Sequence, residues 1–288
     1  MRRQLLVVAA AGLFAAACAR RDAAVRIGSK GFTEQVLLGE IAAQALEAKG
    51  VRVERRFQLG GSFVCHRAML SGDLDLYPEY TGTAFTAILG EAPISDPIEV
   101  ASRVTKAYAE KFDVVWSPPL GFENTFAIVV RGEDATGRSL KTISDLARVA
   151  GQMRPGFGPE FLERKDGYPG LAAAYGLKFR DRPIEMDIGL LYPALLSHRV
   201  DVVAGNSTDG LIAAMDLAVL EDDKRYFPPY EAAFVVRGPV WRDNAAVREV
   251  LVGLAGRIDV RTMRRLNAAV DRDKRPAEDV ARAFLSSR

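Results

Sequence analysis

The strongest constraint on the fold is the alternation of strand patterns with helical patterns along residues 25–80. Residues 25–27 predict a strand, and apolar residues then recur at helical spacing over 37–46. Residues 51–57 predict a second strand, Ser62 can cap a short helix, and a third strand follows. A strand–helix–strand–helix–strand order needs crossover connections, which place parallel strands in one sheet with helices on its faces. The chain is therefore predicted to be an α/β protein.

Residues 72–83, which read GDLDLYPEYTGT, place a polar segment directly after a predicted strand. Leu74 and Leu76 alternate with aspartates and predict the strand, and Pro78 is expected to end it because proline lacks a backbone donor. Residues 80–83 should then form a loop. Since ligands of open α/β sheets bind beyond the carboxyl ends of the strands, the ring and hydroxyls of this loop indicate a binding site. An ordinary strand-to-helix turn fits the same residues.

A second α/β unit begins at the apolar run 127–130. In this unit the predicted strand 200–204 is followed by the polar loop 206–210, as in the first unit. The predicted strands 113–116 and 233–236 lie near two segments that look like crossings between the units. Two units joined by two crossings predict a cleft between two lobes, although a single larger doubly wound sheet fits the same pattern.

The amino-terminal residues have the pattern of an export signal. Arg2 and Arg3 precede a short apolar run, and residues 1–17 end in three alanines before Cys18. The run is too short to span a membrane and predicts a cleaved secretory signal. Cleavage before Cys18 would allow lipid attachment, as in a bacterial lipoprotein, whereas ordinary signal peptidase fits the same alanines. We therefore expect an exported protein, either periplasmic or lipid-anchored to the outside of the cytoplasmic membrane.

The charge balance argues against nucleic acid as a partner. The chain has 39 basic and 37 acidic residues, and two of the arginines lie within residues 1–17. Removal of that segment leaves 37 basic residues against 37 acidic ones, so the mature chain is expected to be near neutrality. A nucleic-acid-binding protein would instead concentrate positive charge.

The residues needed for catalysis or metal binding are sparse. The chain has two histidines, His66 and His198, and no H-E-x-x-H, G-x-S-x-G or C-x-x-C spacing occurs. Cys65 lies in an apolar helical pattern, which predicts a buried and inert thiol. The acidic residues within 73–79 resemble a solvated strand edge more than a metal site. No enzyme, cofactor or metal is therefore expected.

A binding site for a small molecule fits the residues better. Lys30, Thr83 and Arg164 lie at loop or helix-start positions suited to one anionic group such as a carboxylate. Ring faces that could attract a quaternary ammonium occur at four comparable positions, namely Tyr80, Phe126, Phe161 and Tyr192. A ligand with a trimethylammonium at one end and a carboxylate at the other matches both sets. Core packing of the rings, with Lys30 and Arg164 as surface charges, fits the same residues.

Eight motifs stand in order along the chain: GSKGFTEQ (28–35), LGG (59–61), DLYPEYTGT (75–83), GPEF (158–161), DGYPGL (166–171), STDG (207–210), LEDDK (220–224) and PPY (228–230). Together they resemble the substrate-binding proteins of glycine betaine/choline/carnitine ABC transporters, the osmoprotectant family. The resemblance implies the type II periplasmic binding protein fold, with two lobes, a two-strand hinge and a ligand in the cleft. It places lobe 1 at residues 24–126 plus 229–288 and lobe 2 at 127–228.

The resemblance also assigns roles to individual residues. The family's carboxylate-binding positions fall on Lys30, Thr83 and Arg164. The residues that surround the cation in the family fall on five positions, Tyr80, Phe126, Phe161, Tyr192 and Asn206.

Two of these positions depart from the family pattern, and a further position, Asn124, varies within the family. Phe126 keeps a ring but lacks the usual tyrosine hydroxyl, and Asn206 replaces a tyrosine wall by an amide. Asn124 stands where some members place an aspartate near the cation. The residues expected to bind the anionic group are therefore all present, whereas the residues expected to surround the cation include fewer aromatic groups. This difference favours a ligand that carries a carboxylate.

The expected function is that of an extracytoplasmic receptor of an ABC importer. It should bind a small zwitterionic osmoprotectant such as glycine betaine, act as a monomer and deliver the ligand to a permease. Choline fits less well because it lacks the carboxylate. Two alternatives stay open: a receptor for a different carboxylate-bearing ligand, such as an amino acid or another betaine, and a periplasmic enzyme built on the same fold.

Overall fold

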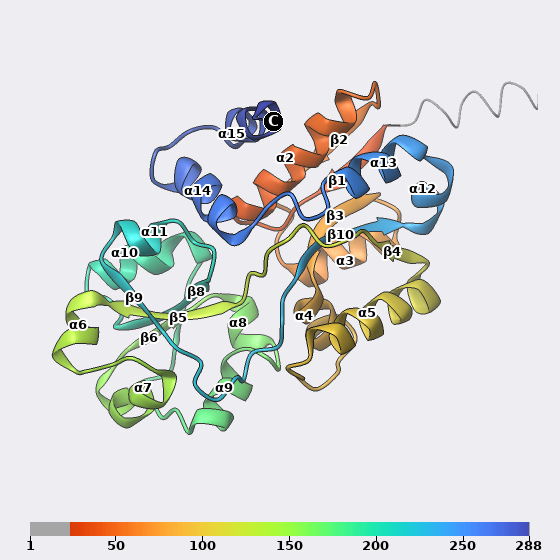
Figure 1. Ribbon diagram of the computed structural model, residues 1–288. Helices are drawn as coiled ribbons and strands as arrows, with labels where there is room; N and C mark the ends of the chain where they lie inside the picture. The colour runs from red at the N-terminus through yellow and green to blue at the C-terminus, as the bar shows by residue number, and fades with distance from the viewer. Residues whose placement is uncertain (1–23, 288) are drawn as a thin grey trace, which may run out of the picture.

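The computed structural model describes residues 24–287 and consists of two α/β lobes (Figure 1). The predicted signal at residues 1–17 and Cys18 lie outside the described residues. Two segments, 117–125 and 221–231, cross between the lobes and connect their sheets (Figure 1). We call the part built on the first sheet lobe 1 and the part built on the second sheet lobe 2.

Lobe 1 is built on a five-stranded mixed sheet. Its strands, in spatial order, are β2 (Val53–Arg56), β1 (Val25–Gly28), β3 (Leu76–Tyr80), β10 (Ala232–Arg237) and β4 (Val114–Trp116). β1 pairs in parallel with β2 and β3, and β10 pairs antiparallel with β3 and β4. Its helices are α2 (Thr33–Glu47), α3 (Ser62–Leu70), α4 (Thr81–Thr83), η1 (Ala84–Ile88), α5 (Pro97–Phe112), α12 (Gly238–Asp243), α13 (Ala245–Gly253), α14 (Val260–Asp271) and α15 (Ala277–Ser286).

Lobe 2 repeats this architecture with shorter helices. Its strands, in spatial order, are β7 (Ile184–Glu185), β6 (Pro155–Phe157), β8 (Val202–Asn206), β5 (Phe126–Arg131) and β9 (Leu217–Leu220). β6 pairs in parallel with β7 and β8, and β5 pairs antiparallel with β8 and β9. Its helices are α6 (Gly132–Gly137), α7 (Ile143–Val149), η2 (Ala150–Gln152), α8 (Pro159–Glu163), α9 (Tyr168–Tyr175), η3 (Ile188–Leu190), α10 (Leu191–Leu196) and α11 (Leu211–Ala214).

The mixed sheets agree with the predicted α/β class, and the separate sheets exclude the single doubly wound sheet that the sequence left open. The predicted strand 233–236 lies inside β10 and is part of the lobe 1 sheet. Phe126, predicted as the last residue of lobe 1, is the first residue of β5. The exact lobe boundaries, 24–126 plus 229–288 and 127–228, stay a prediction.

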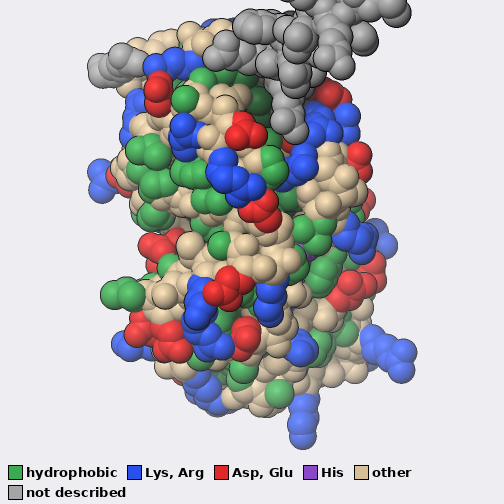
Figure 2. Space-filling model, turned by 90° about the vertical axis from the view of Figure 1, so that its right-hand side faces the viewer, with side chains coloured by type: hydrophobic (Ala, Val, Ile, Leu, Met, Phe, Trp, Pro, Cys, Tyr) green, Lys and Arg blue, Asp and Glu red, His purple; other side chains and the backbone are tan. Residues whose placement is uncertain are grey.

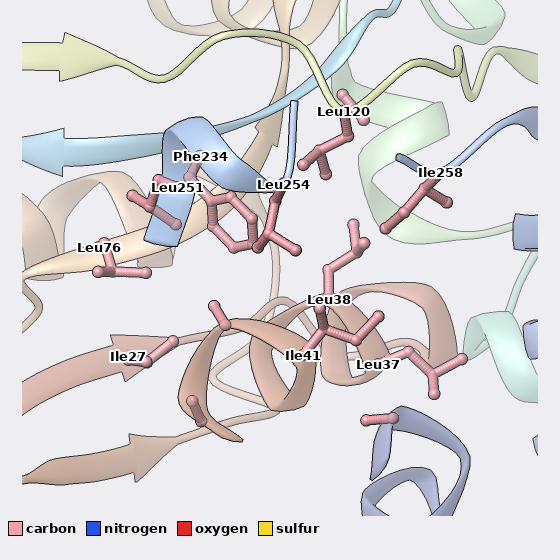
Figure 3. Packing of buried hydrophobic residues seen from close by; sticks show 14 of the residues in the cluster. Ile27, Leu37, Leu38, Ile41, Leu76, Leu120, Phe234, Leu251, Leu254 and Ile258 are labelled. Atoms are coloured by element: carbon pink, nitrogen blue, oxygen red, sulfur yellow. The ribbon is translucent and has the colours of Figure 1, made fainter. Parts of the chain in front are cut away.

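Each sheet is covered on both faces by apolar side chains, because alternate strand residues point to opposite faces. In lobe 1 the larger cluster lies between the sheet and helices α2 and α13. Figure 3 shows its labelled members, among them Ile27, Leu38, Ile41, Phe234 and Leu251. All five are fully buried. This packing holds the amino-terminal end of α2 against the ends of β1 and β3.

Two local predictions for residues 72–83 were wrong. Pro78 lies inside β3, opposite Phe234 of β10. Proline is tolerated there because β1 pairs with β3 only at Ile27 and Leu76, so beyond Leu76 no second strand needs a backbone donor. The residues after Tyr80 form α4 and η1 instead of a loop.

On the surface, basic and acidic side chains are interspersed on the face drawn in Figure 2. Within residues 24–287, no helix is both long enough and apolar enough to cross a membrane.

Gly82 permits close packing between α4 and the second crossing. A Cβ at this position would lie 2.6 Å from the Pro229 carbonyl oxygen and 2.6 Å from Cδ1 of Tyr230. Gly82→Ala should therefore lower the free energy of unfolding by about 1–3 kcal/mol through overpacking, measured by urea denaturation. Gly137→Ala is the matched control, because a Cβ there meets nothing within 4 Å. Equal stability of the two variants would contradict this account.

Candidate ligand-binding site

A cavity of about 60 Å³ lies between the two lobes. A buried water needs roughly 10–15 Å³ on the same measure, so the cavity has room for a molecule of a few heavy atoms. Its lining residues come from the loop after β1, the end of β3 and α4, both crossings and the start of β5, the segment from the end of β6 through α8, η3, and the end of β8. They are Lys30, Phe32, Tyr80, Thr83, Asn124, Phe126, Gly158, Glu160, Phe161, Arg164, Ile188, Ala204, Gly205, Asn206 and Tyr230.

Eight of the nine predicted ligand-binding residues line this cavity. They are Lys30, Tyr80, Thr83, Asn124, Phe126, Phe161, Arg164 and Asn206. The ninth, Tyr192, is not among the lining residues. It is buried on α10, and its hydroxyl approaches the position that a side chain on Gly205 would occupy, so it supports the cavity wall from behind.

Lys30 brings a buried positive charge to the lobe 1 side of the cavity. The residue is 3% exposed, and its ammonium forms an ion pair with Glu79 of β3. Glu79 Oε1 also accepts a hydrogen bond of 2.8 Å from the Tyr80 backbone N–H. The Lys30 Nζ lies 4.8 Å from the centroid of the Tyr80 ring, a cation–π arrangement. Lys30 is thus fixed at the cavity with Glu79 behind it.

Arg164 brings the second positive charge, from lobe 2. It follows α8 in extended conformation, so it is not part of a helix with Phe161 as predicted. Its Nε donates to Asp166 Oδ1 at 2.9 Å, and Tyr230 Oη donates to Asp166 Oδ2 at 2.6 Å. The guanidinium carbon lies 5.1 Å from the Phe126 ring centroid.

The pairing with Asp166 keeps Arg164 charged despite its burial. Burial opposes the charged form of each group, yet the Asp166 carboxylate raises the pKa of Arg164 and the guanidinium holds the pKa of Asp166 below its usual range. Because Asp166 accepts from Nε and Nη2, the Nη1 donors stay available on the other edge of the guanidinium. On that side Glu160 Oε2 lies 3.7 Å from Nη1.

Glu34 is a buried carboxylate that sequence reasoning did not include in the site. It lies in the first turn of α2 and is 2% exposed. Its Oε1 accepts from Tyr80 Oη at 2.6 Å and from Asn124 Nδ2 at 2.9 Å, and its Oε2 accepts from Asn267 Nδ2 at 3.1 Å. Burial raises the pKa of Glu34, and these hydrogen bonds act in the opposite direction. Glu34 therefore lies directly behind two cavity-lining side chains.

Asp209 occupies a comparable place in lobe 2. Its Oδ2 accepts from the Asn206 backbone N–H at 2.9 Å and from the Tyr192 hydroxyl. Burial raises the pKa of Asp209 to about 6, and the nearby carboxylates Glu34 and Asp271 contribute in the same direction. Asp209 thus contacts the cavity-lining residue Asn206 from the side away from the cavity, as Glu34 contacts Tyr80.

Direct contacts join the lobes around the cavity. Glu160 of lobe 2 accepts from the backbone N–H of Ser62 in lobe 1. On the other side, α14 contacts the loop after β8: Arg264 donates to the Ser207 carbonyl at 3.0 and 2.8 Å, and Asn267 donates to the Thr208 carbonyl at 3.0 Å. The cavity is therefore bounded by residues of both lobes.

The residues tested for catalysis lie away from the cavity. His66 is buried and packs edge-on against Phe112, with ring centroids 4.8 Å apart, whereas His198 is exposed. Burial raises the pKa of the Cys65 thiol to about 12, which makes it an inert buried group as predicted. Within the part of the chain that the structure describes, no group of three or more His, Cys, Asp or Glu residues could hold a metal ion.

This architecture corresponds to that of a known protein family. Residues 23–287 match the model for the substrate-binding domain of ABC-type glycine betaine transport systems. The chain belongs to this family. The match confirms the resemblance found in the motifs.

Curated relatives agree with this family assignment. A glycine-betaine-binding protein of Pseudomonas aeruginosa is 37% identical, with 97% of this chain and 92% of the relative covered. A carnitine transport binding protein of Listeria monocytogenes is 35% identical, with coverages of 91% and 85%. A solved structure described as a glycine betaine/carnitine/choline ABC transporter is 35% identical, with coverages of 91% and 97% and a TM-score of 0.74. The periplasmic binding protein fold is thereby confirmed.

Several cavity residues of this family member were missed from the sequence. Tyr230 and Glu160 lie in the motifs PPY and GPEF but were not assigned to the site. Tyr230 donates a hydrogen bond to Asp166, the partner of Arg164, and these two residues are 64 positions apart in the sequence. Phe32 and Ile188 add apolar surface. No local spacing signals such contacts.

Asp209 should make the stability of the protein depend on pH. Its pKa of about 6 lies above the reference value of 3.8, so the folded state binds the proton more tightly than the unfolded state. The resulting stability is fully present below about pH 4 and is lost as the pH rises to about 6, up to about 3 kcal/mol in total. Asparagine does not titrate, so the Asp209→Asn variant should not lose this stability. The free energy of unfolding of Asp209→Asn minus that of wild type, measured by urea denaturation, should therefore increase as the pH rises from about 4 to about 6.

Asp181→Asn is the matched control, because it removes an exposed charge, 64% accessible, from the same lobe. If the difference between Asp209→Asn and wild type were the same at pH 4 and pH 7, the raised pKa would be wrong.

Proposed function

We propose that this family member is the receptor of an ABC importer and binds a small zwitterion, with glycine betaine as the first candidate. The observation that carries the proposal is the convergence of Lys30, Arg164 and Thr83 with aromatic side chains in one interlobe cavity. The two cations and the hydroxyl suit a carboxylate. The rings of Phe161 and Phe32 suit the methyl groups of a quaternary ammonium.

The names of the relatives support this ligand class. They include binding proteins for glycine betaine, for carnitine and, in Helicobacter pylori, for ergothioneine. A different betaine or an amino acid is therefore the second candidate. A thermal-shift screen of betaines, choline, carnitine and amino acids separates them, because a ligand that binds only the folded state raises the unfolding temperature.

We further propose that the protein acts outside the cytoplasmic membrane as a monomer and passes its ligand to a permease, with lipid attachment at Cys18 as one means of anchoring. A receptor, and not an enzyme, is proposed because neither histidine lies at the cavity. Incubation with glycine betaine should return the ligand unchanged, as measured by NMR, and turnover would favour the enzyme alternative.

The proposed mechanism is closure of the lobes around the ligand, which shifts the population from open to closed forms. The contacts of Glu160 with Ser62 and of α14 with the loop after β8 are those that would form on closure. A ligand that touches both Lys30 and Arg164 would stabilise this form, since the two cations belong to different lobes.

Loss of either cation should weaken binding. Lys30→Ala and Arg164→Ala should each raise the dissociation constant for glycine betaine by about 100-fold, because a charge-assisted hydrogen bond is lost and a carboxylate is left buried without its partner. Isothermal titration calorimetry measures this. Arg180→Ala is the matched control, because its side chain is 74% exposed. Wild-type affinity in both cavity variants would contradict the proposed anion site.

Gly210 tests the contact between α14 and lobe 2. A Cβ on Gly210 would lie 2.5 Å from the backbone nitrogen of Ala268 in α14, so Gly210→Ala should hold the lobes apart. The variant should bind glycine betaine about tenfold more weakly and show a larger radius of gyration in small-angle X-ray scattering with ligand present.

Gly189→Ala is the control in the same lobe, because a Cβ there meets nothing within 4 Å. Wild-type scattering and affinity for Gly210→Ala would show that closure does not need this contact.

A further inference from the structure

Apart from Glu160, which lines the cavity 3.7 Å from Arg164 Nη1, the charged groups around the cavity fall into two sets. Lys30 and Arg164 each have a buried carboxylate as a partner, Glu79 and Asp166 respectively. Glu34 is buried too and Asp209 is half-buried, and within residues 24–287 no Lys, Arg or His forms an ion pair with either of them. All of their hydrogen-bond donors are neutral. The protein therefore balances its cavity cations and leaves two carboxylates unbalanced.

The two carboxylates flank one region of the cavity. Glu34 hydrogen-bonds to the side chains of Tyr80 and Asn124, which line the cavity from lobe 1 and the first crossing. Asp209 hydrogen-bonds to the Asn206 backbone, which lines it from lobe 2. Phe126 pairs with Asn206 across β5 and β8, so Asn124 and Asn206 lie near the same end of these strands. Each carboxylate is thus separated from the cavity by a single residue.

Two of the aromatic rings that line the cavity are already paired with cations of the protein. The Tyr80 ring already interacts with the Lys30 ammonium, and the Phe126 ring with the Arg164 guanidinium. At the position where the family resemblance implies a tyrosine wall, this chain has the amide of Asn206. The cation–π attraction of Tyr80 and Phe126 is therefore largely used within the protein, so a nearby carboxylate would add to the attraction that the Phe161 and Phe32 rings offer a cationic ligand group.

We propose that Glu34 and Asp209 are the counter-charges for the cationic group of the ligand and determine the specificity of the site for a positively charged end. This inference rests on the proposed function. Removing a carboxylate from water is costly unless a charge partner or hydrogen bonds compensate. Here the hydrogen bonds are neutral, and a ligand cation adds the missing positive charge. Since the medium between carboxylate and cavity is protein, the attraction is stronger than it would be in water.

Other charged groups close to the pair do not cancel it. Asp271 of α14 accepts a hydrogen bond from Thr33 and adds negative potential near Asp209, and Lys274 offsets part of its charge. Lys30 is bound to Glu79. The region behind Tyr80, Asn124 and Asn206 therefore keeps a net negative charge.

The rival explanation is that both carboxylates only position the cavity wall through their hydrogen bonds. Glu34→Gln and Asp209→Asn separate the two explanations, because each amide keeps an acceptor oxygen and the shape of the side chain but removes the charge. The Asn267 and Asn124 amides each have a buried oxygen without a partner, which can accept from the new amide after a flip. Both variants should therefore fold.

The experiment compares glycine betaine with 3,3-dimethylbutanoate, which has the same shape and carboxylate but a carbon in place of the charged nitrogen. Calorimetry measures both dissociation constants for wild type, Glu34→Gln, Asp209→Asn and the control Asp181→Asn. Each cavity variant should bind glycine betaine about tenfold more weakly and 3,3-dimethylbutanoate at least as tightly as wild type does. Asp181→Asn should match wild type for both ligands.

Three results would overturn the inference. An equal loss of affinity for both ligands would show a positioning role only, and an unchanged preference for glycine betaine would show that the charges do not act on the ligand. In both cases the proposed function would survive, because wild type binds glycine betaine. Failure of wild type to bind any quaternary ammonium would overturn the proposed function and the inference together. If circular dichroism shows that Glu34→Gln does not fold, the comparison of the two ligands with Asp209→Asn alone tests the inference.

Discussion

The buried ion pair between Arg164 and Asp166 is the interaction on which the binding site depends most directly. It fixes a guanidinium at the wall of lobe 2, and Tyr230 of the second crossing donates to the same carboxylate. The pair therefore ties the cavity cation to a segment that connects the lobes. Lys30 and Glu79 form the equivalent pair in lobe 1. In each lobe a carboxylate from the protein is paired with the cation and fixes its position at the wall of the cavity.

The sequence predicted the α/β class and most of the cavity because the site lies at strand ends and loops, which have clear local signals. Lys30 follows β1, and Thr83 and Asn206 follow or end strands of the two sheets. The position of Pro78 was mispredicted because the sequence does not show that β1 leaves that part of β3 unpaired. Tyr192 was predicted at the cavity because its ring type fits, but the backbone of Gly205 lies between them.

Glu34 shows why some functional residues escape sequence reasoning. An acidic residue in the first turn of a helix is explained by the helix dipole alone, and nothing nearby in sequence marks it as buried. Its partners Tyr80, Asn124 and Asn267 lie 46, 90 and 233 residues away. Only the packing of α2 and α14 against the crossing brings them together. Burial, and not residue type, distinguishes this carboxylate from an ordinary solvated one.

The unbalanced carboxylates also link stability to specificity. A protein selected for stability alone would replace Asp209 by asparagine, since the amide can accept the same hydrogen bonds without the cost of burying a charge. The presence of two such groups beside one cavity is expected for a binding site whose electrostatic complement is the ligand itself. The same reasoning explains the asymmetry of the cavity. Its cations are balanced by Glu79 and Asp166, so a ligand carboxylate gains directed hydrogen bonds there, whereas at the opposite region a ligand cation supplies the charge that the protein lacks.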